Sequence, residues 1–196
     1  MRAAANSGVL ALVLAAGQGR RFGSDKRRAL LADGTPLLVA SLLQAQRHFA
    51  HVCVLLRDTD DAQSLGVPAG VEVLRCAAAD AEQGMGHSLA AGVKALQAQS
   101  AHSIAVLLGD MPWLSAGTLG LLLEHAGPQR IVFPLYQGQR GHPVVFGRQF
   151  WPQLQQLSGD SGAKAVLAAE PQACISVTVD DPGVLRDVDS PAALLG

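Results

Sequence analysis

A run of small and basic residues lies between positions 14 and 26, where the chain reads Leu14-Ala-Ala-Gly17-Gln-Gly19-Arg-Arg21-Phe-Gly23-Ser-Asp-Lys26. Because glycine carries no side chain, backbone N–H groups in such a loop can approach and hydrogen-bond phosphate oxygens. Arg21 and Lys26 could then neutralise a triphosphate and stabilise the charge that develops on a leaving pyrophosphate. The alternative is an ordinary glycine-rich loop with a solvated basic face.

Two familiar nucleotide-binding motifs fit this loop poorly. Gly17, Gly19 and Gly23 give the pattern G-x-G-x-x-x-G, one residue off the dinucleotide-binding fingerprint, and no acidic residue follows at the expected distance of about 20 residues. The basic pair Arg20-Arg21 would also intrude where the helix of that motif needs small apolar residues. The sequence is not a P-loop either, because it lacks the Gly-Lys-Ser/Thr ending.

Aspartates in two later segments are candidate metal ligands. Asp110 follows a buried apolar run, where it can hold Mg²⁺ together with substrate phosphate oxygens, or else cap a turn. Asp187 and Asp189 alternate in the segment 186–191, and alternate residues of a strand point the same way, so both could face one site. Alternatively, Asp189 or Ser190 caps a last helix. We favour Asp187 for the metal and leave open whether Asp189 touches it.

Two further segments are weaker candidates. Residues 84–92 open a helix with small residues, which suits the binding of a base or phosphate but also suits plain helix packing. Gly141-His142-Pro143 is placed at a hairpin, where His142 could contact an acceptor phosphate or could be an exposed turn histidine.

Apolar runs and turn residues predict an alternation of strands and helices, which indicates an open α/β sandwich. The expected strands span residues 9–15, 51–56, 71–74, 103–108, 131–134, 143–147 and 174–179. The expected helices span residues 35–49, 88–99, 115–125, 148–157 and 160–168, with a final helix from 190. Residues 77–86 are expected to be a loop, and the turn at 137–141 predicts a β-hairpin insertion.

The segments that carry chemistry coincide with predicted strand ends. In an open α/β sheet, the loops at the carboxyl ends of the strands build the ligand site. Residues 16–26, 109–112 and 187–191 all follow predicted strands. We therefore expect these three segments to meet at one edge of the sheet.

Composition narrows the class of protein. We expect residues 1–196 to form a single domain, rich in Ala, Leu and Val, with close helix–sheet packing. The formal net charge of −1 gives no sign of a general affinity for nucleic acid or membranes, whereas the basic cluster within residues 20–28 would meet a small anion. No stretch approaches the ~20 apolar residues of a membrane span. The apolar run 9–16 is too short for a secretory signal and leads directly into basic residues.

The cysteines point to a reducing compartment. Cys53, Cys76 and Cys174 are odd in number, widely spaced and without a CxxC pair. This argues against a disulfide framework and against a zinc site, and it favours a cytoplasmic protein.

In this order, the segments resemble the nucleotidyltransferases of the glycosyltransferase-A-like fold, and most closely the molybdenum cofactor cytidylyltransferases. The opening pattern of that family, L-A-A-G-x-x-x-R-x-G-x-x-K, is met by Leu14, Ala15, Ala16, Gly17, Arg21, Gly23 and Lys26. Its G-M-x-x-S-L-x-x-G segment is met by Gly84, Met85, Ser88, Leu89 and Gly92. This chain also resembles the family at four further segments: Gly109-Asp-Met-Pro112, Gly141-His-Pro143, Gly159-Asp-x-Gly-Ala163 and Asp187-Val-Asp-Ser-Pro191.

The resemblance implies a Rossmann-like three-layer α/β/α sandwich with a mostly parallel sheet, and Mg²⁺-dependent transfer of CMP from CTP to the phosphate of a molybdopterin-type acceptor. A molybdenum hydroxylase or its insertion chaperone would receive the product. The implied catalytic residues are Arg21, Lys26 and Asp110, and the implied metal ligands are Asp110 and Asp187. The nucleotide would contact Leu14, Ala15, Ala16, Gly17, Gly19, Gly84, Ser88 and Gly109, and the acceptor would contact Gly141, His142 and Pro143.

Some alternatives remain within and outside this family. Guanylyltransferase relatives usually open L-A-G-G, so the L-A-A-G at residues 14–17 suggests CTP over GTP. The chain departs from the family at Gly19, often Ser, at Phe22, often Met, and at Ser190, often Thr, which puts the acceptor in doubt more than the reaction. A sugar or polyol phosphate is therefore an alternative acceptor. A noncatalytic nucleotide-sensing or NAD(P)-binding module is a further alternative.

Overall fold

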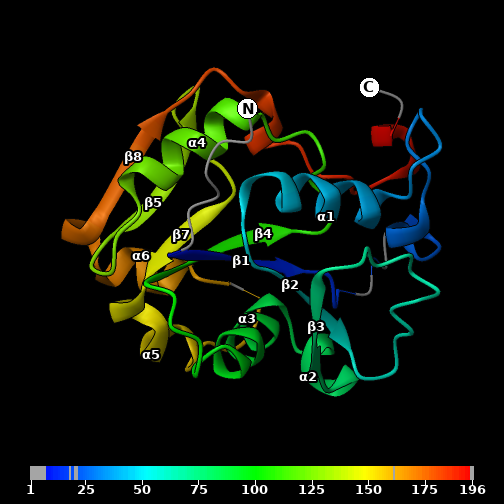
Figure 1. Ribbon diagram of the computed structural model, residues 1–196, viewed down its shortest axis with the longest axis horizontal. Coiled ribbons are helices and arrows are strands. Elements are labelled where there is room, and N and C mark those ends of the chain that lie inside the picture. The colour runs from blue at the N-terminus through cyan, green and yellow to red at the C-terminus, as the bar shows by residue number, and fades with distance from the viewer. Residues whose placement is uncertain (1–7, 18, 20–21, 161, 195–196) are drawn as a thin grey trace.

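The apolar runs form one mixed sheet in the order β3-β2-β1-β4-β7-β5-β6, with β8 paired to β5 (Figure 1). The computed structural model describes residues 8–17, 19, 22–160 and 162–194. The strands within these residues are β1 (Val9–Leu14), β2 (Val52–Arg57), β3 (Val71–Cys76), β4 (Ser103–Leu108), β5 (Ile131–Tyr136), β6 (Gln139–Arg140), β7 (Val144–Gly147) and β8 (Cys174–Thr178).

One half of the sheet is parallel, as predicted. β3, β2, β1 and β4 run parallel to one another, and β1, β2 and β4 each bury five of their six residues. Continuous apolar runs of this kind are typical of strands that are covered on both faces. The carboxyl ends of these strands therefore lie along one edge of the sheet.

The predicted β-hairpin is part of the main sheet and not an insertion outside it. β5 and β6 join through Gln137 and Gly138, whose φ values of 48° and 78° match a two-residue hairpin turn. β7 then lies between β4 and β5 and runs antiparallel to both, while β8 runs parallel to β5. β7 thus links the parallel half of the sheet to its second half, which a local turn signal could not reveal.

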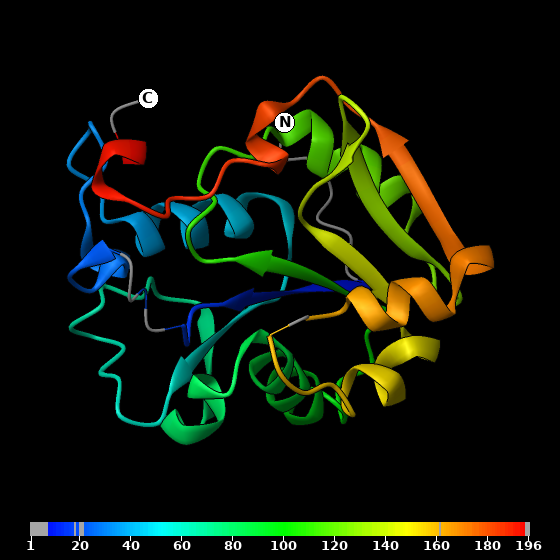
Figure 2. The same cartoon turned by 180° about the vertical axis from the view of Figure 1, so that it is seen from behind.

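Helices cover both faces of the sheet and give the predicted three layers. α1 and α4 lie over one face, and α2, α3, α5 and α6 lie over the other (Figures 1 and 2). Their bounds are α1 (Leu37–His48), α2 (Ala78–Glu82), α3 (Met85–Ala95), α4 (Ala116–His125), α5 (Trp151–Leu154) and α6 (Lys164–Ala169). No helix within the described residues is both long enough and apolar enough to cross a membrane.

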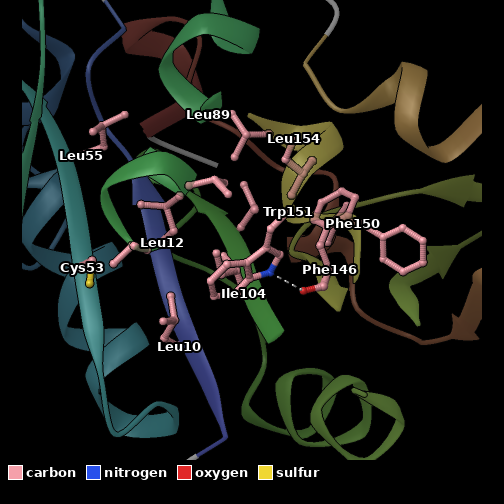
Figure 3. Packing of buried hydrophobic residues seen from close by; sticks show 14 of the residues in the cluster. Leu10, Leu12, Cys53, Leu55, Leu89, Ile104, Phe146, Phe150, Trp151 and Leu154 are labelled. Carbon is pink, nitrogen blue, oxygen red and sulfur yellow. Dashed lines mark hydrogen bonds between the residues drawn. The ribbon is translucent and has the colours of Figure 1, made fainter. Parts of the chain in front are cut away.

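The core divides into two clusters, one on each side of the sheet. Successive residues of a strand point to opposite faces, so Leu10 and Leu12 of β1 pack on the α3 side, whereas Ala11 and Val13 pack on the α1 side. Figure 3 shows the α3-side cluster, where Trp151 donates its indole N–H to the carbonyl of Phe146 at 3.4 Å. Both faces of the central strands β1, β2 and β4 are therefore shielded from water.

Several predicted helix bounds need correction. α1 begins at Leu37 and not at residue 35, with Pro36 as its N-cap and no side-chain cap from Thr35. The expected loop 77–86 contains α2, and α3 begins at Met85 because Gly84 turns the chain with a φ of 118°. The helices expected at 148–157 and 160–168 are the shorter α5 and α6, and the last helix is a 3-10 turn, Pro191–Leu194.

Candidate active site

The carboxyl ends of β1 and β4 open onto a cavity of about 680 Å³. The loop after β1, the loop after β4 and the start of α3 form its walls. All of the residues expected to contact a nucleotide line it, namely Leu14, Ala15, Ala16, Gly17, Gly19, Gly84, Ser88 and Gly109. Lys26, Asp110, Asp187 and Asp189 also line it. Arg21 lies outside the residues that the structure describes.

Lys26 reaches across the cavity mouth from the 3-10 turn Lys26–Arg28. Its Nζ lies 2.5 Å from Oδ2 of Asp110 and 3.4 Å from the carbonyl oxygen of Val188. Gly19, at a φ of 56°, lies against the Lys26 stem, where an added Cβ would come within 3.2 Å of Cγ. The absence of a side chain at Gly19 therefore leaves room for the Lys26 side chain to pass.

Arg27 holds the loop in place and does not face a ligand, which corrects the expectation that the whole basic cluster meets an anion. Its guanidinium is buried and donates to Ala15 O at 3.0 Å, to Asp25 at 2.8 Å and to Asp60 at 2.6 Å. Burial alone would lower the pKa of Arg27, but its hydrogen bonds to Asp60 and Asp25 raise it overall. The guanidinium of Arg28 likewise donates to protein oxygens, namely the carbonyl and the hydroxyl oxygen of Ser64.

Three carboxylates converge beside Lys26. One oxygen each of Asp110, Asp187 and Asp189 lies within 4.8 Å of the others, and Lys26 Nζ is 3.8 Å from Asp189 Oδ1. Asp187 and Asp189 lie on an irregular segment and not on the predicted strand end; the buried Val188 between them donates its N–H to Asp110 O at 3.1 Å. Burial first, then the charges of Asp189 and Asp110, raise the pKa of Asp187.

These carboxylates form an all-oxygen donor set, which suits Mg²⁺ or Mn²⁺ better than a softer metal. The raised pKa of Asp187 reflects burial first and then repulsion by Asp189 and Asp110, and a divalent cation would relieve that repulsion. The residues therefore fit the metal expected at Asp110 and Asp187, and Asp189 is close enough to take part.

Asp187→Asn should raise the melting temperature of the metal-free protein at neutral pH and weaken its stabilisation by Mg²⁺. A carboxyl whose pKa is raised by folding contributes stability below its ordinary pKa, near 3.9, and loses it as pH rises through the folded value. At neutral pH the charged group therefore opposes folding. Thermal melts with and without Mg²⁺ test this, with the exposed Asp180→Asn as control. An undiminished response to metal and an unchanged metal-free melting temperature would contradict the assignment.

The segment that carries these aspartates is fixed by Asp181, which sequence reasoning missed. Asp181 is buried, and its carboxylate accepts hydrogen bonds from Ser115 N at 2.9 Å, Thr118 Oγ1 at 2.7 Å and Gly183 N at 2.9 Å. An added Cβ at Gly183 would lie 2.2 Å from the carbonyl oxygen of Trp113. The start of α4 and the chain at 181–188 are therefore locked together.

The opposite wall depends on close backbone contacts at the start of α3. An added Cβ at Gly84 would lie 2.2 Å from Asp160 Oδ1, and one at Gly86 would lie 2.7 Å from Ser158 O. Gly86 donates its N–H to Gly159 O at 2.8 Å, and Gly159 donates to His87 Nδ1 at 3.0 Å. The small residues of this motif thus seat the loop at 158–160 on the helix.

The expected acceptor residues do not line the cavity, although His142 is close enough to the carboxylate cluster for the charge of Asp110 to act on it. Gly141 donates to Pro134 O at 3.0 Å, and His142 donates its backbone N–H to Val184 O at 2.8 Å. Among the described residues, the buried Nδ1 of His142 has no hydrogen-bond partner, so this is not an exposed turn histidine. Burial lowers the pKa of His142 although Asp110 opposes the shift, so the ring is neutral at neutral pH. Its contact with an acceptor stays a prediction.

A second feature that the sequence did not reveal lies next to the aspartates. The guanidinium of Arg186 stacks over the ring of Trp113 at 3.7 Å from its centroid. Arg186 directly precedes Asp187, and Trp113 lies three residues after Asp110. A planar cation is therefore held on an aromatic face at the edge of the carboxylate cluster.

Residues 11–174 match the family described as the MobA-like NTP transferase domain. The chain belongs to this family. It is 31% identical to the purine catabolism protein PucB of Bacillus subtilis and to nicotine blue oxidoreductase of Paenarthrobacter nicotinovorans. Each comparison covers 93% of this chain and 92% of the relative.

Solved structures show the same MobA-like fold. Rv0371c of Mycobacterium tuberculosis superposes with a TM-score of 0.83 at 26% identity, over 95% of both chains, and has also been solved as a complex with manganese. Molybdopterin-guanine dinucleotide biosynthesis protein A of Archaeoglobus fulgidus superposes with a TM-score of 0.66 at 19% identity, over 95% of both chains. The three-layer α/β fold and the assignment as a nucleotidyltransferase are thereby confirmed.

Proposed function

We propose that the protein transfers CMP from CTP to the phosphate of a molybdopterin-type acceptor in a Mg²⁺-dependent reaction that releases pyrophosphate. The observation that carries the proposal is the meeting of Lys26, Asp110 and two further carboxylates at the mouth of a cavity lined by the motif residues. A cation and a metal-binding set at one end of a nucleotide-sized cavity suit transfer at a phosphate. The product would pass, in the cytoplasm, to a molybdenum hydroxylase or its insertion chaperone.

The residues of the site mainly align the two substrates and neutralise the negative charge of their phosphates. The acceptor phosphate has its second pKa near ~6, so it is largely ionised at neutral pH and needs no strong general base for its in-line attack on the α-phosphorus. Lys26, together with Arg21, would neutralise the triphosphate and the departing pyrophosphate. Held by Asp110 and Asp187, Mg²⁺ would supply further charge neutralisation at the phosphate oxygens. Glycines of the loop after β1 would offer backbone N–H groups to the phosphates.

The preference for CTP rests on Ala16. This residue stands where guanylyltransferase relatives usually have glycine, and its methyl group is buried in the wall of the cavity. A methyl group at this position would leave less room for a base than glycine does, so we expect a pyrimidine to fit better than a purine.

Pyrophosphate release from CTP, GTP, ATP and UTP, with Mg²⁺ and with or without molybdopterin-type cofactor, tests the proposal. Cofactor-dependent release from CTP alone is expected. Cofactor-dependent release from GTP would instead identify the protein as a guanylyltransferase. Absence of release with every nucleotide from a folded protein would overturn the proposed acceptor.

A second candidate function follows from the relative named nicotine blue oxidoreductase, which is as similar to this chain as PucB is. An oxidoreductase that uses a nicotinamide dinucleotide would oxidise or reduce that cofactor and would release no pyrophosphate. The same preparation should therefore be assayed for loss of NADH and NADPH absorbance with a dye acceptor. Dinucleotide oxidation without Mg²⁺, and no pyrophosphate release, would favour this second function.

Arg186→Ala is expected to raise the KM for the acceptor about tenfold or more while leaving the KM for CTP unchanged. Arg186 directly precedes Asp187 of the carboxylate cluster and is held over Trp113, and a charge-assisted hydrogen bond to an anionic acceptor contributes about 1.5–3 kcal/mol. Steady-state kinetics with each substrate varied in turn measure the effect. The exposed Arg47→Ala is the control. Equal changes in both KM values would contradict a role confined to the acceptor.

A further inference from the structure

A second group of metal-ligating side chains lies away from the cavity, at the start of β2. His51 Nε2 lies 2.7 Å from Glu72 Oε2, and the thiol of Cys53 donates to the same oxygen at 3.5 Å. The three ligand atoms lie within 4.8 Å of one another. We propose that His51, Cys53 and Glu72 form a binding site for Zn²⁺ or a similar transition metal, separate from the nucleotide site.

The strand register brings these side chains together. β2 and β3 pair in parallel with Cys53 directly opposite Glu72. His51 precedes Cys53 by two residues, and its carbonyl already accepts the N–H of Ala11 at 2.9 Å, so His51 and Cys53 project from the same face. The donors therefore come from two neighbouring strands of the rigid sheet, which suits a preformed site.

The site lies at the opposite end of β2 from the nucleotide cavity. β2 ends at Arg57, which binds the Asp60 carboxylate that anchors Arg27 at the cavity wall. His51 and Arg57 are six positions apart along extended chain, a distance of about 20 Å. An ion at the proposed site therefore cannot touch a nucleotide in the cavity.

The donor set differs in kind from the aspartate cluster. An imidazole, a thiolate and a carboxylate are the ligands that Zn²⁺ takes in proteins, with a water completing the tetrahedron, whereas Mg²⁺ prefers oxygen alone. His51 and Glu72 each expose 42% of their side chains, so two of the three donors are open to solvent, whereas Cys53 is buried. The sequence argued against a zinc site because it has no CxxC pair. The site proposed here needs only one cysteine, together with a histidine and a glutamate.

Metal binding would replace the thiol proton that Cys53 donates to Glu72. Burial first, and then the Glu72 carboxylate, raise the pKa of the Cys53 thiol to about 12, so the metal-free group is not a reactive thiolate. A bound ion would also join β3, the edge strand, to β2. We therefore expect the ion to stabilise the fold without entering the nucleotidyl transfer.

Titration with Co²⁺ tests the site, because ligation by a thiolate gives a near-ultraviolet charge-transfer band that oxygen ligands do not give. The native protein should show this band, saturating at one ion per chain, and Zn²⁺ should abolish it by competition. Cys53→Ser should remove the band. His51→Ala and Glu72→Gln, both at exposed positions, should weaken Co²⁺ binding about tenfold or more without disturbing the core.

Two variants separate this site from other ligands. Cys174→Ser changes a cysteine elsewhere, and Asp187→Asn changes the aspartate cluster, so both should keep the band. The proposal is overturned if the native protein shows no charge-transfer band, if Cys174→Ser abolishes it, or if His51→Ala and Glu72→Gln bind Co²⁺ as tightly as the native protein. None of these outcomes depends on nucleotidyl transfer, so the proposed function can fail while this site stands.

Discussion

Asp110→Asn is expected to lower Mg²⁺-dependent turnover by about 10³-fold while leaving the fold intact. The substitution keeps the shape of the side chain but removes the charge that pairs with Lys26 at 2.5 Å and that belongs to the metal-binding cluster. Loss of several kcal/mol of charge stabilisation corresponds to about this change in rate, since about 1.4 kcal/mol is tenfold. The backbone oxygen of Asp110 can still accept the N–H of Val188, so the C-terminal segment should stay in place.

Single-turnover rates of pyrophosphate release over a range of Mg²⁺ concentrations measure this effect. Asp180→Asn, at an exposed position, is the matched control and should retain full turnover. Thermal melting and circular dichroism would establish that the variant is folded. A folded Asp110→Asn protein with near-normal Mg²⁺-dependent turnover would remove Asp110 from the metal site.

Arg27→Met is expected to lower the free energy of unfolding by about 3–5 kcal/mol, which is typical of breaking a buried ion pair on one side. Methionine matches the stem of arginine but leaves Asp25 and the largely buried Asp60 without their shared cation, and leaves Ala15 O without its donor. Because Ala15 lines the cavity, turnover should fall together with stability. Arg27 acts here as a positioning residue.

Urea denaturation of Arg27→Met and of the native protein at several pH values measures this. The pKa values of Asp25 and Asp60 are lowered in the fold: burial opposes the shift, and the arginines outweigh it. Their stabilisation is therefore present above the ordinary carboxyl pKa, near 3.9, and is lost as pH falls below it. The variant should lose the share of this acid-sensitive part that Arg27 supplies, while Arg57 still binds Asp60. Arg28→Met, at an exposed side chain, should change stability by less than about 1 kcal/mol. Equal losses in both variants would refute the buried role of Arg27.

The parts of the fold that follow from local pattern could be predicted from the sequence. The apolar runs of β1, β2 and β4 identify strands covered on both faces, and that alone places the loops after β1 and β4 at one edge. The glycines at positions 17 and 84 also identified two walls of the cavity from local sequence, since only small residues let a ligand approach the backbone closely.

The parts that depend on distant partners could not be predicted. Arg27 looked like one of several basic residues until Asp60, from the turn after β2, proved to be its partner. Asp181 stabilises the start of α4 across 66 residues of chain, and no motif records that pairing. α2 has five residues and no side-chain cap, so its small residues resembled a loop. The position of β7 between β4 and β5 likewise depends on which strands pair, and local propensity does not determine that.

The docking of the last segment also bears on when the protein becomes competent during its synthesis. Lys26 and Asp110 lie in segments that are made by the end of β4 and the loop after it, whereas Asp187 and Asp189 belong to the chain at 181–189, which is secured through Asp181 and Val188. A ribosome-bound chain that still lacks this segment would have the glycine loop and only part of the carboxylate cluster. Partly synthesised chains that stop before residue 181 should therefore be unable to consume nucleotide.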